Sequence, residues 1–402
     1  METYLPRIAE KRLTIALSQF PIVMVDGPRA AGKTTTAGLF ANSVVLLPRD
    51  LELLRANPEG LLTSLEPPIL IDEWQLAGTD FLWILKRIVD TDPTPGRFIL
   101  TGSVEPASYG PTYPLTGRSM RVTLLPMAAS EISGHGSAPT FLSRFLDGEL
   151  TPTAGKPAKF EIEHLFTTGF PAARFLPDAA LFLESYAVTV AQRAGDEGRD
   201  ATRFYRTAQV LATLEAQAVP DQRIWEAADI NKATWKNYQD LLARTWLAAP
   251  LPAFSSNRLS RITEYPKRFF IDTALALSLA QITPDDLRRD PVLLGRYLES
   301  YVVAQLRPQA GGFNAKLQHI RTSAGAHEVD AVLEMPRGIV AFEVKAATHV
   351  TRKDARHLLW LRENMGDRFC KGAVVYTGGD VRQLDEHIWA IPLDLLGEAQ
   401  RA

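Results

Sequence analysis

The sequence predicts an α/β protein with three parts. The first 130 residues alternate short apolar, strand-like runs with helical patterns, which is typical of a parallel sheet with helices. Residues 180–250 show helical patterns only, and strand-like runs return after Pro252. We therefore expect a parallel-sheet domain at 1–133, a helical region with a preceding loop at 134–250, and a second α/β domain at 251–402.

Composition limits the classes of protein to which the chain can belong. Its 402 residues are 46% hydrophobic and 22% charged, with a formal net charge of −2, which is ordinary for a globular protein and excludes a histone-like one. The single cysteine, Cys370, cannot form an internal disulfide, and no His/Cys cluster has the spacing of zinc ligands. No apolar run is long enough for a membrane span, and the first residues lack the order of a secretory signal. We expect a cytoplasmic protein without a membrane partner.

Three apolar runs predict the strands of the first domain. Pro21–Asp26, Pro68–Asp72 and Arg97–Thr101 have the length and apolar character of buried parallel strands. Phe81–Val89 carries apolar residues at helical spacing between the last two. The stretch from Gly134 to Pro157 is rich in Gly, Pro, Ser and Thr, which predicts a loop or a domain boundary.

The middle region contains a candidate DNA-binding element. Asp221–Ile230 and Asn231–Leu242 have the pattern of two short helices joined by a tight turn, and Asn231 is a suitable N-cap for the second. This arrangement is typical of a helix-turn-helix, although an ordinary helical bundle fits the same residues equally well.

A phosphate-binding motif follows the first predicted strand. The segment Gly27 to Thr34 matches G-x-x-x-x-G-K-[ST] and lies between a strand and a helix, as a P-loop requires. Its glycines let backbone N–H groups surround phosphates, Lys33 would reach the β- and γ-phosphates, and the Thr34 hydroxyl would bind Mg²⁺. The predicted nucleotide-binding residues are Gly27, Pro28, Arg29, Ala30, Ala31, Gly32, Lys33, Thr34 and Thr35. The expected cofactors are ATP and Mg²⁺.

Carboxylates and hydroxyls end the next two strands. Asp72 would hold Mg²⁺, and Glu73 would orient or deprotonate the attacking water. The third strand ends in hydroxyls, so Ser103, or else Thr101, is the candidate polar sensor of the γ-phosphate. Catalysis is thus assigned to Glu73, Lys33 and Ser103.

An arginine beyond the third strand has two interpretations. Arg118 could reach a γ-phosphate in its own subunit or in a neighbour as an arginine finger, which would imply a homo-oligomer. It could equally be an ordinary surface arginine, since its spacing from the P-loop is not diagnostic.

The C-terminal part contains a second constellation of charged residues. Alternation along Ile339–Lys345 places Glu343 and Lys345 on one face of a strand, and a turn brings Asp330 beside them. This D…E-x-K pattern is typical of Mg²⁺-dependent nucleases, in which the carboxylates hold the metal and the lysine activates water. A hairpin with exposed charges and a cross-strand salt bridge fits the same residues about as well.

The order of these motifs resembles a family of predicted AAA-type ATPases that carry a C-terminal domain of unknown function. The matching segments extend through most of the chain: Gly27 to Thr34, Ile71 to Gln75, Ile99 to Ser103, Gly117-Arg118, Gly169 to Pro171, Pro266 to Thr273, Leu294 to Glu299, Glu328 to Asp330 and Glu343 to Lys345. The resemblance implies an AAA-like P-loop core, a winged-helix-like middle and a restriction-endonuclease-like end. It also implies that Glu299 is a further carboxylate at the metal of the second site.

Two functions fit these expectations. In the first, the chain is an ATP-hydrolysing protein bound to DNA, with a possible nuclease site at Asp330, Glu343 and Lys345. In the second, ATP controls a regulatory switch of the defence or toxin–antitoxin type, whose nuclease-like domain is inactive. Two basic clusters suit contacts with DNA phosphates: Arg258, Arg261, Lys267 and Arg268, and then Arg352, Lys353 and Arg356.

Overall fold

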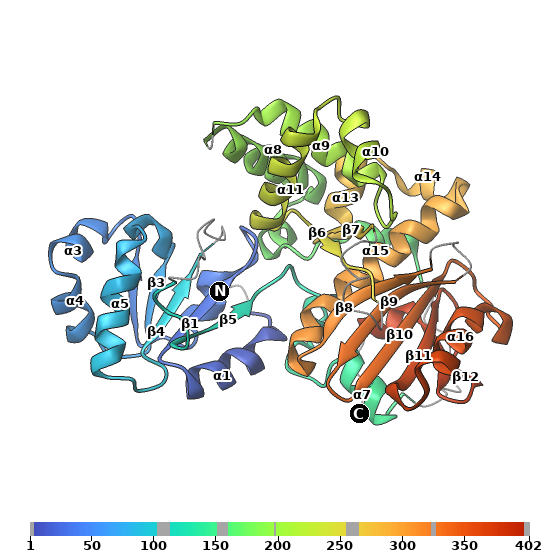
Figure 1. Cartoon of the computed structure of the whole chain (residues 1–402), viewed down its shortest axis with the longest axis horizontal. Coiled ribbons are helices and arrows are strands. Elements are labelled where there is room, and N and C mark those ends of the chain that lie inside the picture. Colours follow the sequence, from blue (N-terminus) through green and yellow to red (C-terminus); the bar gives the residue numbers. More distant parts are fainter. Residues whose placement is uncertain are drawn as a thin grey trace.

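The computed structural model describes residues 4–102, 113–150, 160–196, 198–254, 265–322 and 327–397. Figure 1 shows three units. The parallel-sheet domain with the N-terminus lies at the left, the helical domain at the top, and the second sheet domain at the lower right. None of the helices in these ranges combines the length and the apolar character that a bilayer crossing requires.

The first domain is built on a five-stranded parallel sheet in the order β2-β3-β4-β1-β5, which confirms the predicted parallel α/β architecture. Its elements are α1 Ala9–Gln19, β1 Ile22–Asp26, α2 Lys33–Gly38, β2 Ser43–Leu46, α3 Leu51–Ala56, α4 Pro58–Ser64, β3 Ile69–Asp72, η1 Trp74–Ala77, α5 Asp80–Thr91, β4 Phe98–Thr101, β5 Ser119–Thr123 and α6 Ala129–Ile132. Because β4 lies between β1 and β3, the end of β4 faces both the P-loop and the carboxylates that follow β3.

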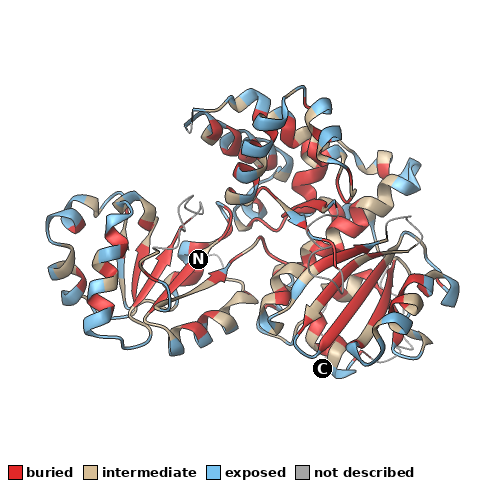
Figure 2. Ribbon diagram, viewed as in Figure 1, coloured by how far each residue is buried: buried red, intermediate tan, exposed pale blue. Residues whose placement is uncertain are grey.

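The sheet is covered on both faces, which explains why its strands are almost continuously apolar. On one face Ile22, Met24 and Ile71 pack with Leu85 of α5. On the other face Val23 and Val25 pack with Leu13 of α1. Figure 2 shows the buried residues concentrated in the strands and on the inner sides of the helices.

The middle domain combines helices with a two-stranded sheet. Its elements are α7 Phe141–Asp147, η2 Ile162–Phe166, η3 Pro171–Phe175, α8 Ala179–Asp196, α9 Ala201–Thr213, α10 Asp221–Ala227, α11 Lys232–Arg244, β6 Ala248–Leu251, β7 Lys267–Phe270, α13 Thr273–Ala280 and α14 Pro284–Arg289. Two short helices separated by a turn are present as predicted, and the Asn231 side chain accepts a hydrogen bond from Thr234 N at 2.8 Å. The antiparallel β6–β7 pair follows them, and the winged-helix-like fold of this region stays a prediction.

Two structural features lie at or across the predicted boundaries. The β6–β7 pair joins strands on either side of residue 250, so a boundary there would divide one small sheet. Helix α7 lies inside the segment from Gly134 to Pro157, for which the sequence predicts a loop or a domain boundary. This helix begins at the N-cap Thr140 and packs on the C-terminal sheet, where the rings of Phe145 and Phe342 lie 5.9 Å apart.

The C-terminal domain is a mixed sheet of six strands in the order β12-β13-β11-β10-β9-β8. Its elements are α15 Pro291–Ala310, η4 Gly311–Phe313, β8 Lys316–Arg321, β9 Glu328–Met335, β10 Gly338–Lys345, η5 Arg352–Ala355, α16 Arg356–Met365, η6 Gly366–Arg368, β11 Phe369–Tyr376, β12 Arg382–Asp385, β13 Ile388–Pro392 and η7 Leu393–Leu396. Strand β10 pairs antiparallel with β9 and parallel with β11. A second α/β domain is confirmed, whereas its likeness to restriction endonucleases stays a prediction.

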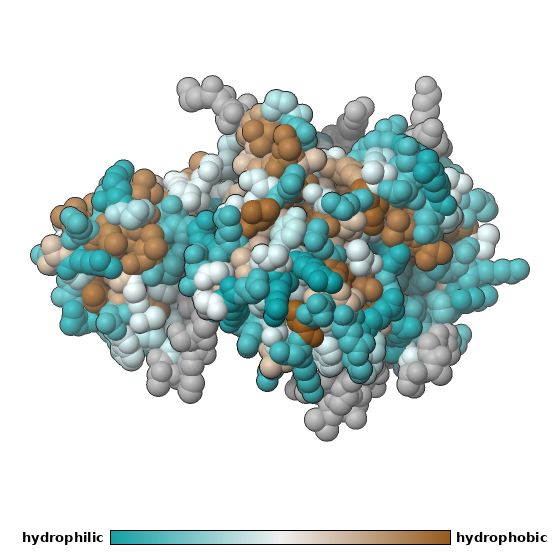
Figure 3. Space-filling view, turned by 90° about the horizontal axis from the view of Figure 1, so that it is seen from above, coloured by the Kyte–Doolittle hydropathy of each residue, from teal (hydrophilic) through white to brown (hydrophobic). Residues whose placement is uncertain are grey.

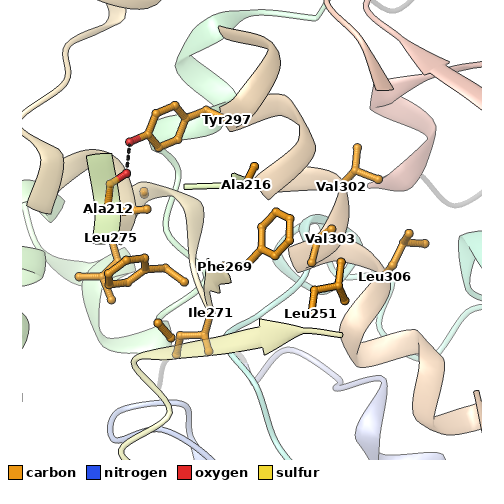
Figure 4. Packing of buried hydrophobic residues seen from close by; sticks show 14 of the residues in the cluster. Ala212, Ala216, Leu251, Phe269, Ile271, Leu275, Tyr297, Val302, Val303 and Leu306 are labelled. Carbon is orange, nitrogen blue, oxygen red and sulfur yellow. Dashed lines mark hydrogen bonds between the residues drawn. The ribbon is translucent and has the colours of Figure 1, made fainter. Parts of the chain in front are cut away.

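Helix α15 joins the middle and C-terminal domains in one continuous core. In Figure 4 the hydroxyl of Tyr297 donates a hydrogen bond to the carbonyl of Ala212 in α9, a contact of 2.9 Å. Val302, Val303 and Leu306 belong to the same cluster as Phe269 of β7. The outer surface seen from above is mostly hydrophilic, with separate hydrophobic spots (Figure 3).

Candidate functional site

The P-loop connects β1 to α2 in a backbone conformation that requires glycine at its first position. Gly27 has φ 138°, and a Cβ atom there would lie 2.1 Å from the carbonyl oxygen of Leu124. Ala30 and Gly32 also have positive φ values, 58° and 90°. Successive N–H groups in such a loop form a concave site for an anion, so the local conformation fits the predicted phosphate cradle.

The lysine of the motif is buried without a carboxylate hydrogen-bonded to it. Lys33 is 7% exposed, and its Nζ donates to the carbonyl oxygens of Gly27 at 3.1 Å and Pro28 at 2.7 Å. Burial lowers the pKa of Lys33 to about 8, against the opposing charges of Glu73 and Asp72. The ammonium group is therefore poorly compensated, and a phosphate would supply the missing negative charge.

Thr34, Asp72 and Thr101 meet at the carboxyl ends of β1, β3 and β4. The Thr34 hydroxyl donates to Asp72 Oδ1 at 2.9 Å, and the Thr101 hydroxyl donates to the same oxygen. A hydroxyl and a carboxylate oxygen this close are the hard donors that Mg²⁺ prefers, so the pair fits the predicted metal ligands. Of the two candidate γ-phosphate sensors, Thr101 contacts Asp72, and Ser103 lies outside the described residues.

Glu73 is held by the turn that follows β3. It has φ 53°, begins the 3-10 helix η1, and accepts a hydrogen bond from Gln75 Nε2. Gln75 and Trp74 pack against Gly102, where a Cβ atom would lie 2.9 Å from Gln75 Oε1. Sequence inspection missed Gln75, because glutamine two residues after an acidic pair is not by itself a signal.

Arg118 lies far from the phosphate site. It precedes β5, whose residue Ser119 pairs with Ile22, so Arg118 lies at the amino-terminal edge of the sheet, about 17 Å from the end of β1. Its Nε donates to Asp90 of α5. This position contradicts a role as an arginine finger in its own subunit, and a role in a neighbouring subunit stays a prediction.

A buried arginine in the N-terminal segment braces the P-loop, and sequence inspection did not find it. Arg7 is 4% exposed and donates to the carbonyls of Ala31 at 2.8 Å and Leu125 at 2.6 Å, and to Glu131 Oε1 at 3.1 Å. Glu131 also accepts from Ile8 N and Ala128 N, each at 2.6 Å. The only sequence signal for this network was a lone arginine before the first helix.

The Gly169–Pro171 turn of the middle domain lies against the P-loop. A Cβ atom at Gly32 would be 3.6 Å from the Pro171 ring. The buried carboxylate of Asp272 fixes the turn by accepting from Gly169 N at 2.7 Å and from the Thr168 hydroxyl at 3.1 Å, and it also caps α13. Asp272 therefore connects the wall of the phosphate site to the middle domain.

Two of the predicted metal-binding carboxylates, Glu299 and Asp330, contact a buried lysine. Lys267 of β7 is 1% exposed, and its Nζ lies 2.7 Å from Glu299, 2.8 Å from Glu328 and 3.3 Å from Asp330. Burial lowers the pKa of Lys267, but Glu299 and then Asp330 outweigh this effect and hold it above the ordinary value. Burial also raises the pKa of Glu299 well above its usual range.

The remaining two residues of the pattern form a neighbouring pair. Lys345 Nζ donates to Glu343 Oε1 at 2.7 Å, and Asp330 Oδ2 accepts from Val344 N at 2.8 Å. Burial, followed by the charge of Asp330, raises the pKa of Glu343 to about 8. The four residues predicted for this site, Asp330, Glu343, Lys345 and Glu299, thus lie close together.

These contacts place a lysine at the predicted metal centre of Asp330, Glu343 and Glu299, and metal binding there stays a prediction. Sequence inspection placed Lys267 in a surface cluster, whereas its ammonium occupies the position between the carboxylates and supplies the cation there. Within the described ranges, no three His, Cys, Asp or Glu side chains are arranged to hold a metal ion.

The first predicted basic cluster is also not a free surface. Arg268 is 7% exposed and pairs with Asp221, so it and Lys267 are internal. Arg258 and Arg261 lie outside the described residues. The second cluster, Arg352, Lys353 and Arg356, is exposed at the beginning of α16.

Comparison with known proteins covers all three domains. Residues 19–133 match the model of a family described as an AAA domain, while 162–286 and 294–396 match two models described as domains of unknown function. The chain is 28% identical over 405 residues to an uncharacterised protein of Mycobacterium tuberculosis, a match that covers 96% of this chain and 83% of that protein. An uncharacterised protein of Mycobacterium bovis matches to the same extent.

Two solved structures are similar at a low level. A Walker-type ATPase of Pyrococcus abyssi aligns with a TM-score of 0.39 and 14% identity, over 69% of this chain and 99% of that one. A protein of Vibrio cholerae aligns with a TM-score of 0.20 and 11% identity, over 94% and 95%. The family match and the arrangement of Lys33, Thr34 and Asp72 together identify residues 19–133 as an AAA-like P-loop ATPase domain.

Proposed function

We propose that this protein binds ATP with Mg²⁺ and hydrolyses it at the P-loop. The observation that carries the proposal is the group formed by Lys33, Thr34 and Asp72. A buried ammonium without a carboxylate hydrogen bond lies next to a hydroxyl–carboxylate pair 2.9 Å apart. These are the parts that phosphoryl transfer to water needs: a cation for the β- and γ-phosphates and hard oxygen ligands for a metal.

Each residue would have a defined task. Lys33 would leave the carbonyls of Gly27 and Pro28 for the phosphates, and Thr34 and Asp72 would hold Mg²⁺, which supplies positive charge for the developing phosphate charge. Glu73 would orient the attacking water and accept its proton. Thr101 would keep Asp72 in place through its hydroxyl.

The nucleotide state would reach the other domains by two contacts. The Gly169–Pro171 turn touches Gly32, so a nucleotide that shifts the P-loop would push on Asp272 and α13. In the second contact, Arg7 links Ala31 to Glu131 of α6. The first residue of the same helix is bound to α15, because Ala129 N donates to Gln305 Oε1 at 2.7 Å. Helix α15 carries Glu299 of the Lys267 cluster.

Turnover measurements test the proposal. Glu73→Gln should lower ATP turnover by at least about a hundredfold while ATP binding remains, because only the water-orienting carboxylate is lost. Lys33→Ala should lose both binding and turnover. Glu59→Gln, an exposed carboxylate of α4, is the matched control and should behave as wild type. Wild-type turnover by Glu73→Gln would remove Glu73 from the mechanism.

DNA is the proposed partner of the middle domain, and α11 favours it. Lys232 and Lys236 are exposed one turn apart on this helix, while Trp235 and Tyr238 face the core. A second helix that presents cations after a tight turn suits phosphate contacts on a duplex. Lys232→Ala and Lys236→Ala should each weaken duplex binding and reduce its salt dependence.

The second candidate function is an ATP-controlled switch, and Lys267 favours it for the C-terminal domain. A cluster that carries its own cation suits an interaction domain better than a catalytic one. DNA-stimulated ATP turnover would support the DNA-coupled ATPase, whereas slow turnover that DNA leaves unchanged would support the switch. Assembly into a homo-oligomer is part of either proposal, with Arg118 available to a neighbouring subunit.

A further inference from the structure

Three arginine side chains line a cavity where the middle domain meets the C-terminal sheet. The cavity has a volume of about 360 Å³ and lies between the segment after α9, helix α15 and the ends of β8 and β9. Arg223 comes from α10, Arg296 from α15 and Arg321 from β8. This volume lies at the lower end of the range for sites that bind small molecules.

The three guanidinium groups have unused capacity for hydrogen bonds. Within the described ranges, the Arg223 side chain makes no hydrogen bond or ion pair. Arg296 Nη1 donates to the Thr213 carbonyl at 3.2 Å, but its Nε is buried without an acceptor among the described residues. Arg321 Nη1 donates to the Ala218 carbonyl at 3.3 Å. None of the three is within ion-pair distance of a described carboxylate, so their charges are not neutralised pairwise.

Two carboxylates also line the cavity, but both are already bound. Glu299 and Glu328 lie 2.7 Å and 2.8 Å from the Lys267 ammonium. Lys267 therefore neutralises these two carboxylates, while the three arginines remain available to bind a ligand in the cavity. This division of charges leaves the cavity with an excess of positive charge at its lining.

We propose that this junction cavity binds a phosphate group. Guanidinium groups present planar pairs of N–H donors that match the oxygens of a phosphate, and a buried Nε without an acceptor is a donor that such an oxygen would satisfy. The phosphate could belong to a nucleic-acid strand or to a free phosphate compound. The cavity is separate from the P-loop and from the Lys232–Lys236 surface of α11. Phosphate binding there can therefore be tested independently of the proposed function.

The test uses the full chain with Lys33→Ala, so that the P-loop contributes no phosphate binding. Two probes are titrated at low salt: a 5′-labelled single-stranded 12-mer, followed by fluorescence anisotropy, and inorganic pyrophosphate, followed by calorimetry. Arg223→Gln, Arg296→Gln and Arg321→Gln are each added to this background. Arg87→Gln, which removes one exposed arginine from α5, is the control. Arg223→Gln should not disturb folding, because the Arg223 side chain makes no hydrogen bond or ion pair with the described residues. Weaker probe binding by this variant therefore cannot be explained by misfolding.

We expect each cavity variant to weaken probe binding by about tenfold and the control to leave it unchanged. With the 12-mer, each variant should also lower the slope of log affinity against log salt by about 0.7. Loss with both probes supports a site for phosphate itself, and loss with the 12-mer alone supports a nucleic-acid backbone. Unchanged binding in all three variants, or no binding of either probe to the background protein, would overturn the proposal. ATP turnover of the three variants with native Lys33 should equal that of wild type.

Discussion

Two buried lysines, Lys33 in the first domain and Lys267 on β7 of the middle domain, have opposite electrostatic surroundings. Lys33 donates to two backbone carbonyls, and burial lowers its pKa to about 8. Lys267 is bound by Glu299, Glu328 and Asp330, which outweigh burial and raise its pKa. Both lie beside carboxylates that belong to sequence patterns of phosphate chemistry. Of these two lysines, only Lys33 has no carboxylate within ion-pair distance among the described residues.

This difference separates a site built for a ligand from a cluster that satisfies itself. A buried charge without a partner is costly, so its presence in a native fold points to a partner that arrives from outside. A buried charge held by several opposite charges needs nothing further, and its removal leaves those charges uncompensated. The P-loop thus fits a working site, and the Lys267 cluster fits a structural joint between β7, α15 and β9.

The largest expected effect concerns stability. Lys267→Met should lower the free energy of unfolding by about 3–5 kcal/mol, because the buried Glu299 and the partly exposed Asp330 and Glu328 would lose their cation. Lys33→Met should change it by about 1 kcal/mol or less, since no carboxylate depends on Lys33 for a hydrogen bond. Urea unfolding of both variants measures the two values, and similar losses would erase the distinction between the lysines.

A second prediction uses the lowered pKa of Lys33. Above pH 8 the free protein loses the proton from Lys33, so ATP binding must take it up again, and affinity should fall by up to about tenfold per pH unit. Below pH 8 the affinity should not depend on this group. Calorimetry of Mg·ATP binding between pH 7 and 9.5 measures the effect, with Glu343→Gln as a control that retains the same profile. A flat profile to pH 9.5 would show that Lys33 does not titrate in this range.

A third prediction concerns Glu343, whose folded pKa of about 8 lies above its ordinary value. The native state therefore keeps a proton that the unfolded chain releases, and this stabilisation is complete below about pH 4.5 and lost as the pH rises to 8. Across this window stability should fall by about 1 kcal/mol per pH unit, and Glu343→Gln should flatten the decline. An unchanged slope in the variant would assign the pH dependence to other groups, Glu299 first among them.

The smallest expected effect belongs to Lys345, the second lysine of the C-terminal cluster. The Lys345 side chain is 34% exposed and pairs with Glu343 alone. Lys345→Met should cost about 1 kcal/mol or less, because water screens the pair and Glu343 can hold a proton. If Lys345→Met lost as much stability as Lys267→Met, the burial of a lysine would not determine how much it contributes to the free energy of unfolding.

The sequence was sufficient for features that depend on local pattern. Apolar runs gave the strands of the first sheet, and the P-loop motif gave Lys33 and Thr34, because backbone conformation there is determined within a few residues. The cap at Asn231 followed from local chemistry in the same way. The D…E-x-K pattern correctly predicted that Asp330 and Glu343 lie close together.

The missed features depend on contacts between distant segments. Nothing near Lys267 in the sequence reveals that β7 inserts it between α15 and β9, so it was placed in a surface cluster. Arg7 reaches residues more than a hundred positions away. The two interpretations of Arg118 stayed open because only the register of β5 with β1 shows at which edge of the sheet it lies. The contact between α7 and the C-terminal sheet likewise joins segments that are remote in sequence.

The most direct test of this account measures Mg·ATP affinity and unfolding free energy together in Lys33→Ala and Lys267→Met, at a temperature where both are folded. We expect Lys33→Ala to lose ATP binding and keep nearly wild-type stability, and Lys267→Met to keep ATP binding and lose about 3–5 kcal/mol of stability. The opposite pairing, with ATP binding intact in Lys33→Ala or lost in folded Lys267→Met, would contradict the assignment of the P-loop as the working site.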